Sequence, residues 1–389
     1  MKLTLRQQIT QFAHVLQTGL FPVLQEELGE LSEPAKRLVA ILEMIPLARF
    51  VPSGRGWIGR PSKDRLAIAS AFVAKAVYGL STTRQLLEAL HSDPPLRRIC
   101  GWSESRQVPH EATFSRAFEE FARMELPQFV HETLIRETQK DRLIGHIARD
   151  STAIEARERF PETPQQAAAQ PAPAKKKRGP KPGRRGPHKR HPGGKPKYQP
   201  KSGTRMHRQR RMSLPEMLAD LPTGCSLGVK TSNGHQSYWT GYKLHLDVAD
   251  GQIPISAIVT GAGLHDSQVA IPLATMTAQR VTSMYDLMDA AYDATEIMEH
   301  SRSLGHIPII PAVKRGRKDS PEGVHAARQF TWAEADRFRE RTMVERVYGR
   351  LKDEFGGRDI RVRGARKVMA HLMFGVLALT ADQLMKLVS

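Results

Sequence analysis

The sequence predicts an α/β domain with a mixed β-sheet, preceded by an all-α N-terminal domain. Residues 1–125 contain segments with helical apolar spacing that are separated by short breaks. From about residue 140, short apolar runs with strand-like patterns alternate with amphipathic segments. This change of pattern places the second domain at residues 126–389.

Three segments carry the helical pattern in the N-terminal domain, at residues 60–80, 81–93 and 110–124. Ser81 and Thr113 stand near the starts of two of them, where hydroxyl side chains cap helices. Short helices of this kind fit a helix-turn-helix DNA reader. A plain helical bundle has the same pattern, so the sequence leaves both interpretations open.

The second domain is expected to contain five strands. Alternating apolar and polar residues indicate a strand at 241–248, and Asp250-Gly251 is a hairpin turn signal. Two strands are expected to end in an acidic residue, one at Asp150 and one at Asp289. In chain order the expected strands are 143–150, 241–248, 253–260, 283–289 and 306–313, and the expected helices are 265–276, 295–305, 338–356 and 368–388.

A basic insertion, residues 161–212, separates the first two expected strands. From Lys175 to Arg211 it contains sixteen Lys or Arg and no Asp or Glu, in a chain with a net charge of +19. Rich in proline and glycine, it has little to bury, so we expect it to be disordered and to bind DNA phosphates. A solubilising linker is the alternative. The cations singled out as DNA contacts are Lys175, Lys176, Lys177, Arg178, Arg184 and Arg185.

Composition excludes several other classes of protein. Two cysteines are too few for a disulfide framework or a Cys-based zinc site. Residues 1–17 lack the uninterrupted apolar run of a secretion signal. The most apolar stretch, 368–388, carries Asp382 and Lys386, which is more typical of a packed helix than of a membrane span. We therefore expect a cytoplasmic protein with no membrane partner.

Three carboxylates stand out by position. Asp150 and Asp289 each end an expected strand, although Asp150 could instead cap a turn. On the expected helix, Arg341, Glu345 and Lys352 lie within about 40° of each other, at the edge of an apolar stripe. Taken alone, that group could be an exposed ion pair. Acids at strand ends and on a nearby helix can converge, and such oxygen ligands suit two Mg²⁺ or Mn²⁺ ions.

The spacing on this helix resembles that of the DDE transposases of bacterial insertion sequences. In that family an aromatic residue, an Arg, the catalytic Glu and a Lys follow one another after two, three and six intervening positions. The matching residues here are Phe338, Arg341, Glu345 and Lys352. The segments RDSTAIEA and DAAYDA resemble the family's two Asp motifs, and the N-terminal part resembles the helical domain that often precedes the catalytic one. The family commonly has Tyr where Phe338 stands, so a hydroxyl contact to DNA is missing here.

The resemblance implies a ribonuclease-H-like fold and a two-metal reaction that cuts DNA at element ends and joins them to a target. Asp150, Asp289 and Glu345 would then hold two Mg²⁺ (or Mn²⁺) ions, and Arg341 and Lys352 would contact DNA phosphate. The implied partners are terminal inverted repeats, target DNA and a second copy of the chain in a homodimer assembled on DNA. The implied location is the bacterial cytoplasm, in association with the nucleoid. A nuclease that cuts without joining and an inactive DNA-binding descendant are the alternatives.

Other acids near these motifs have competing interpretations. Asp286 and Asp293 compete with Asp289, which we prefer because it ends the apolar run. Asp266 stands at an expected helix start, where capping is its expected role. Glu155 is expected on the surface rather than at the metals.

Overall fold

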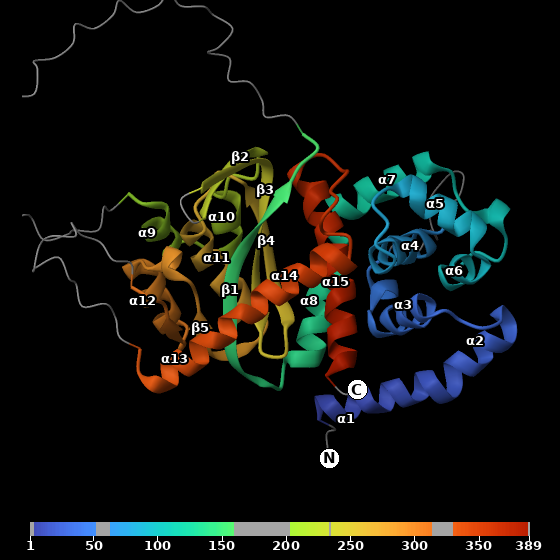
Figure 1. Cartoon of the computed structure of the whole chain (residues 1–389), viewed down its shortest axis with the longest axis horizontal. Helices are drawn as coiled ribbons and strands as arrows, with labels where there is room; N and C mark the ends of the chain where they lie inside the picture. Colours follow the sequence, from blue (N-terminus) through green and yellow to red (C-terminus); the bar gives the residue numbers. More distant parts are fainter. Residues whose placement is uncertain (1–3, 52–62, 159–202, 233–234, 313–329, 388–389) are drawn as a thin grey trace, which may run out of the picture.

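The computed structural model describes residues 4–51, 63–158, 203–232, 235–312 and 330–387. The six cations singled out above therefore lie outside the described residues, as does most of the basic insertion: Lys175, Lys176, Lys177, Arg178, Arg184 and Arg185. The described residues form a β-sheet, the helices that cover it and a helical N-terminal region (Figure 1).

Six strands form one mixed sheet within the part of the chain that the structure describes. Its order is β2-β3-β1-β5-β6, with β4 also paired to β3. β1 runs antiparallel to β3 and parallel to β5, which runs parallel to β6. The central strand β1 is therefore flanked by strands of both directions. The strands are β1 (Leu143–Glu155), β2 (Ser226–Ser232), β3 (His235–Ala249), β4 (Ile253–Gly261), β5 (Thr282–Leu287) and β6 (Ile307–Ile309).

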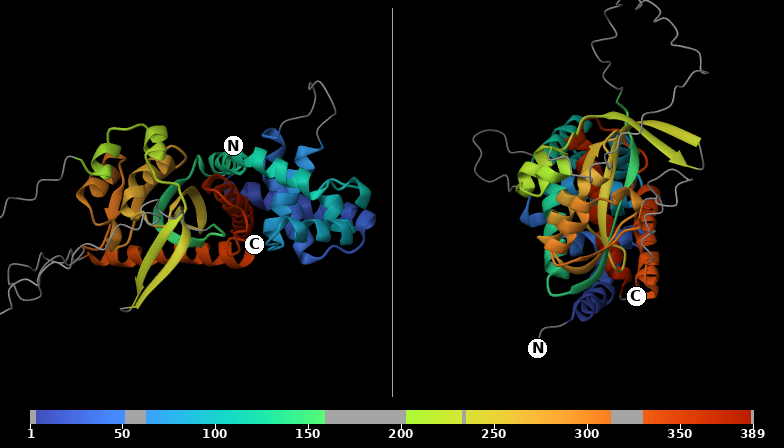
Figure 2. Two further views of the ribbon diagram at one scale, coloured as in Figure 1. Left: turned by 90° about the horizontal axis from the view of Figure 1, so that it is seen from above. Right: turned by 90° about the vertical axis from the view of Figure 1, so that its left-hand side faces the viewer.

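Helices cover both faces of this sheet (Figures 1 and 2). Because side chains alternate along a strand, Leu244 and Leu246 of β3 face a core shared with α14 and α15. Ile258 of β4 faces the other way and packs with residues of α11. The helices of this domain are α8 (Leu126–Gln139), α9 (Arg205–Gln209), α10 (Leu214–Ala219), α11 (Ser267–Ala278), α12 (Thr295–Ser303), α13 (Trp332–Arg339), α14 (Met343–Glu354) and α15 (Ala365–Lys386), with the short 3₁₀ turns η5 (Ala290–Tyr292) and η6 (Glu340–Thr342).

The N-terminal region is helical, as predicted, and it packs against the C-terminal helix. Phe72 of α4 and Phe118 of α7 lie 5.7 and 6.4 Å from Phe374 of α15, measured between ring centroids. One continuous apolar core therefore extends from the N-terminal helices into the sheet domain. The helices are α1 (Leu5–Val15), α2 (Phe21–Leu28), α3 (Glu33–Met44), α4 (Arg65–Val77), α5 (Thr83–Ser92), α6 (Pro94–Ile99) and α7 (Glu111–Arg123), with the π-helical turn η1 (Leu16–Leu20) and the 3₁₀ turns η2 (Leu47–Arg49) and η3 (Ser105–Gln107).

α15 is long and apolar enough to cross a membrane by length and composition, with a mean hydropathy of 1.5 in its most apolar window. In the structure 83% of that window is buried inside the protein. Asp382 on this helix accepts hydrogen bonds from Arg37 of α3 and Arg350 of α14. The helix is thus the central packing element between the two regions.

Three details of the expected elements are wrong. The first strand does not end at Asp150 but continues to Glu155, because Thr152 and Ile154 keep pairing with β3. β2 was not expected; it forms a hairpin with the first half of β3. The expected helix 338–356 is interrupted by the 3₁₀ turn η6, which contains Arg341.

The end of the expected disordered insertion is also folded. Residues 203–212 contain α9, which Thr204 caps by accepting a hydrogen bond from the backbone N–H of His207. Arg205 pairs with Asp220 at 2.8 Å, so part of the local basic charge is neutralised by acids that follow it in the chain. Long-range ion pairs of this kind cannot be read from a run of like charge.

Candidate active site

Asp150 and Asp289 are brought together by the register of two parallel strands. The last pair between β1 and β5 joins Ala148 to Leu287. Two residues further along each chain lie Asp150 and Asp289, which therefore reach the same level of the sheet on neighbouring chain segments. Adjacent strands lie about 4.8 Å apart, so the two carboxylates are neighbours.

Local hydrogen bonds fix each aspartate. The backbone N–H of Ser151 donates to Asp150 Oδ1 at 2.7 Å, and the N–H of Ala291 donates to Asp289 Oδ1 at 2.9 Å. The hydroxyl of Tyr348 on α14 donates to the carbonyl oxygen of Asp150 at 2.6 Å. Each aspartate thus has one carboxylate oxygen fixed by a backbone N–H. The Tyr348 bond to the Asp150 carbonyl also links α14 directly to β1.

Glu345 is linked to Asp150 by Arg341, which lies between the two carboxylates. It lies in the first turn of α14, and its Oε1 accepts a hydrogen bond from Arg341 Nη2 at 2.9 Å. Arg341 Nη1 lies 3.5 Å from Asp150 Oδ2. The Arg341 side chain is 18% exposed, whereas Glu345 is 55% exposed. The Arg341 guanidinium thus contacts carboxylates of β1 and α14, and its charge acts on Asp289. Asp289 does not end β5 as expected but lies two residues beyond it, as the N-cap of η5.

Burial and mutual repulsion disfavour charge on the two aspartates. Burial is the largest cause that raises the pKa of Asp150 to about 6, and the charges of Asp289 and Asp266 add to it. The Ser151 N–H and Arg341 act in the opposite direction. Burial likewise raises the pKa of Asp289, again opposed by a backbone N–H and by Arg341. Such a site favours the approach of further positive charge.

We expect Asp150→Asn to stabilise the metal-free protein at pH 7.5. A folded-state pKa of about 6 instead of 3.8 means that the folded protein loses stability as the pH rises from about 4 to about 6, and the full cost of ionising buried Asp150 is present above the folded pKa. The gain should be about 2–3 kcal/mol in the free energy of unfolding at pH 7.5 and should vanish below about pH 4. Urea unfolding of both proteins, in buffer that contains a metal chelator and at several pH values, measures this difference in the free energy of unfolding. Asp353→Asn, at an exposed site, is the matched control with an expected change within about 0.5 kcal/mol; an Asp150→Asn protein no more stable than this control would contradict the prediction.

The comparison with known families decides the identity of the chain. Residues 142–381, more than half of the chain, match the family described as Transposase DDE domain. The chain belongs to this family. Residues 26–120 match a second family, described as Transposase domain (DUF772). No significant match was found among curated proteins or among solved structures.

Both matches confirm the resemblance seen in the sequence. The α/β domain of this transposase is ribonuclease-H-like, with a mixed sheet, and a helical N-terminal region precedes it, as predicted. The helical part coincides with most of the second matched family. Whether these helices read DNA as a helix-turn-helix stays a prediction.

Lys352 makes a contact that the sequence did not indicate. Its Nζ donates to Thr152 Oγ1 at 2.8 Å and to the carbonyl oxygen of Ala153 at 3.0 Å. It therefore links the later part of α14 to β1, beyond Asp150. Phe338 lies beside Arg341, whose guanidinium carbon is 5.9 Å from the ring centroid. The predicted contact of Lys352 with DNA phosphate stays a prediction, and in this structure the transposase uses the residue to join helix and strand.

Asp266 is a fourth acid near the site. It occupies the N-cap position of α11 but makes no side-chain capping bond, so the expected capping role is wrong. Instead, Asp266 Oδ1 accepts a hydrogen bond from Lys243 Nζ at 2.8 Å, and the same ammonium donates to the carbonyl oxygen of Leu264 at 2.9 Å. The charge of Asp266 raises the pKa of Asp150 and of Asp289.

The other competing acids lie elsewhere. Asp286 is buried and accepts hydrogen bonds from Ser301 Oγ at 2.7 Å and from His306 Nδ1 at 3.2 Å. Asp293 follows η5, and Glu155 is exposed at the end of β1, as expected. The geometry therefore favours Asp289 over Asp286 as the partner of Asp150.

Arg149, which precedes Asp150, points to the opposite face of the sheet. Its Nε and Nη2 donate to the two carboxylate oxygens of Asp247 at 2.8 and 2.7 Å, and both side chains are buried, with 1% and 0% exposure. Arg149 Nη1 lies 3.3 Å from the sulfur of Met288, the residue before Asp289. This buried pair ties together the segments that carry both aspartates. The signal in the sequence that could have indicated this pair is an arginine within an apolar run.

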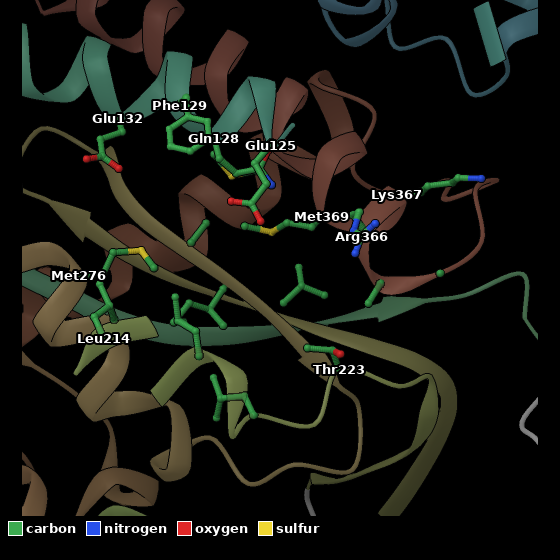
Figure 3. A pocket seen from close by; sticks show the side chains of 18 of the residues that line it. Glu125, Gln128, Phe129, Glu132, Leu214, Thr223, Met276, Arg366, Lys367 and Met369 are labelled. Atoms are coloured by element: carbon green, nitrogen blue, oxygen red, sulfur yellow. The ribbon is translucent and has the colours of Figure 1, made fainter. Parts of the chain in front are cut away.

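A large cavity lies away from these acids (Figure 3). It has a volume of about 830 Å³ and is lined by parts of α8, α10, β4, α11 and α15, including Phe129, Leu214, Met276 and Met369. None of Asp150, Asp289 and Glu345 lines it. Glu345 is instead 55% exposed, so this group of acids reaches the protein surface, where a long duplex can approach.

Proposed function

We propose that this transposase cuts DNA at the ends of an insertion sequence and joins the released 3′-hydroxyls to target DNA. The observation that carries this proposal is the meeting of Asp150 and Asp289 at one level of the sheet, with Glu345 linked to them through Arg341. Membership of the family supports DNA as the substrate and phosphodiester chemistry as the reaction. The bacterial nucleoid is the corresponding place of action.

Asp150, Asp289 and Glu345 would hold divalent ions. Their donor atoms are all carboxylate oxygens, which Mg²⁺ and Mn²⁺ prefer. Among the described residues, no three His, Cys, Asp or Glu side chains are already close enough together to bind a metal ion. The Glu345 carboxylate is paired with Arg341, and reorienting these two side chains would bring the third ligand to the aspartates. When bound, two such ions supply activation of a water or 3′-hydroxyl and stabilisation of the leaving oxygen.

The protein's own residues would orient the DNA around this chemistry. Arg341 presents a planar guanidinium, which can bind phosphate oxygens with two parallel hydrogen bonds. Lys352 lies on α14, which directly follows the turn that carries Arg341, and its contacts fix the distance of α14 from β1. The helical N-terminal region would recognise the terminal inverted repeats, and a homodimer would pair the two ends.

Purified protein tests the proposal directly. Incubated with Mg²⁺ and with DNA that carries the sequences flanking its gene, it should cut at the element ends and produce joined products with a supercoiled target. Cutting without joined products would favour a nuclease of the same fold. Binding without any metal-dependent cutting would favour an inactive DNA-binding descendant.

We expect the basic insertion to supply DNA affinity that is independent of sequence. Replacing residues 165–201, which carry twelve of the sixteen cations between Lys175 and Arg211, with a short Gly-Ser linker leaves α9 in place. If about six phosphate contacts are lost, the log–log slope of affinity against salt should flatten by about five units. Affinity should fall equally for terminal-repeat and scrambled duplexes, because phosphate contacts carry no sequence information.

Fluorescence anisotropy at a series of salt concentrations measures this slope. A variant of unchanged length, with the twelve cations replaced by Gln, separates the effect of charge from that of length and should match the deletion. An unchanged slope would show that the segment is a passive linker. A loss of affinity for terminal-repeat DNA alone would show that the segment recognises DNA sequence.

A further inference from the structure

Arg341 makes more contacts than an ordinary ion pair on a helix surface does. An exposed pair four residues apart is worth only a few tenths of a kcal/mol and involves one helix. Here the guanidinium also reaches Asp150 on β1, with 3.5 Å between Nη1 and Oδ2, and it is four-fifths buried. Its charge further acts on Asp289, where it opposes the effect of burial. The positive charge of Arg341 therefore interacts with Asp150, Asp289 and Glu345.

The surroundings of Arg341 hold it in this place. It lies in the 3₁₀ turn η6, between two α-helices that otherwise continue each other along the sheet (Figure 1). Phe338 lies beneath its guanidinium, and Phe338 in turn packs on Phe330 with 5.2 Å between ring centroids. The arginine is therefore supported on one side by aromatic rings and on the other by carboxylates.

A divalent ion cannot bind the same oxygens while Arg341 stays there. Metal ligands approach to about 2.1 Å, and the guanidinium already occupies the space between Asp150 and Glu345 with charge of the same sign. Arginine has, however, a strong alternative partner in DNA phosphate, which it can bind in bidentate fashion. The Arg341 guanidinium can therefore bind either the carboxylates of the protein or a phosphate of the DNA.

We propose that Arg341 is a positioning residue that occupies the metal site in the absence of DNA and vacates it when DNA phosphate binds the guanidinium. This inference rests on the proposed function, because it assigns the three acids to metal binding. Its consequence is a thermodynamic coupling: DNA strengthens metal binding, and metal strengthens DNA binding by the same factor. The transposase would then load its metals preferentially on DNA.

The test measures Mn²⁺ affinity from the electron paramagnetic resonance signal of free Mn²⁺, so it does not depend on cleavage. Without DNA, Arg341→Ala should bind Mn²⁺ about tenfold more tightly than the wild type, within the usual range of couplings between sites. Adding flanking DNA should tighten Mn²⁺ binding in the wild type about tenfold more than in Arg341→Ala, after subtraction of Mn²⁺ bound by DNA alone. Arg341→Lys, which keeps the charge, should stay within about threefold of the wild type.

Arg346→Ala is the matched control, because it removes one positive charge five residues further along, in the first turns of α14. Its guanidinium donates to Thr342 Oγ1 at 3.3 Å, and no change beyond about twofold is expected. Equal Mn²⁺ affinity of Arg341→Ala and the wild type, with both folded by circular dichroism, would overturn the inference alone. Mn²⁺ binding that is insensitive to Asp289→Asn would instead refute the metal site and with it the proposed function.

Discussion

Asp150→Asn, Asp289→Asn and Glu345→Gln proteins are expected to bind terminal-repeat DNA normally and to cut it at least about a thousandfold more slowly than the wild type. Each substitution keeps the shape of the side chain and removes one of the three negative charges that would hold the metals. Loss of several kcal/mol of transition-state stabilisation corresponds to a rate loss of this size. DNA binding should persist, because the DNA contacts proposed for the basic insertion and for the helical region are retained.

Gel-shift and cleavage assays on the same labelled duplex separate binding from chemistry. Glu155→Gln is the matched control, since Glu155 lies on the same strand as Asp150 but is exposed at its end. It should cut at the wild-type rate. A Glu345→Gln protein that cuts nearly as fast as the wild type would remove Glu345 from the site. Asp150→Asn should be both inactive and more stable, a combination that ordinary structural damage cannot produce.

Arg149→Met is expected to lower the free energy of unfolding by about 3–5 kcal/mol. The substitution leaves the carboxylate of Asp247 fully buried without the guanidinium that donates to both its oxygens. Thr277 Oγ1 donates to Asp247 Oδ2 at 2.6 Å, which is too little to compensate a buried charge. The nearby charge of Asp286, which also acts on Arg149, adds repulsion once the arginine is gone.

The double variant Arg149→Met, Asp247→Leu provides the control for this prediction. Replacing a buried ion pair by apolar residues of similar size is often neutral, so the double variant should recover most of the lost stability. Urea unfolding of the two single variants and the double variant gives the coupling energy. A loss below about 1 kcal/mol for Arg149→Met would show that water reaches Asp247 and that the pair is not sealed in the core.

The parts of the fold set by local pattern could be predicted from the sequence. The alternation over 241–248 and the turn at Asp250-Gly251 correspond to β3 and β4, and the apolar run before Asp289 corresponds to β5. β2 was missed because it is a short edge strand whose Leu227 and Val229 remain exposed, so it has no buried face to reveal it.

The sequence indicates which residues are candidates for the site, but it does not indicate how they are arranged. The spacing of Arg341 and Glu345 already indicates their ion pair, since residues four apart meet on a helix. The contact between Arg341 and Asp150 depends on how α14 crosses β1, which no local pattern encodes. The same reason applies to Lys243 and Asp266, which join β3 to the start of α11 across the fold. Contacts between distant segments require the tertiary structure.

The apolar core that joins α4 and α7 to α15 bears on how genes of this kind decay. A reading frame broken after residue 125 would encode helices that include Phe72 and Phe118 without Phe374, their partner in the missing part. Such a fragment would expose these apolar side chains to water and would aggregate or be degraded, rather than persist as a separate folded protein. Truncation should therefore leave no stable fragment, whereas point changes at Asp150, Asp289 or Glu345 would leave the whole chain folded.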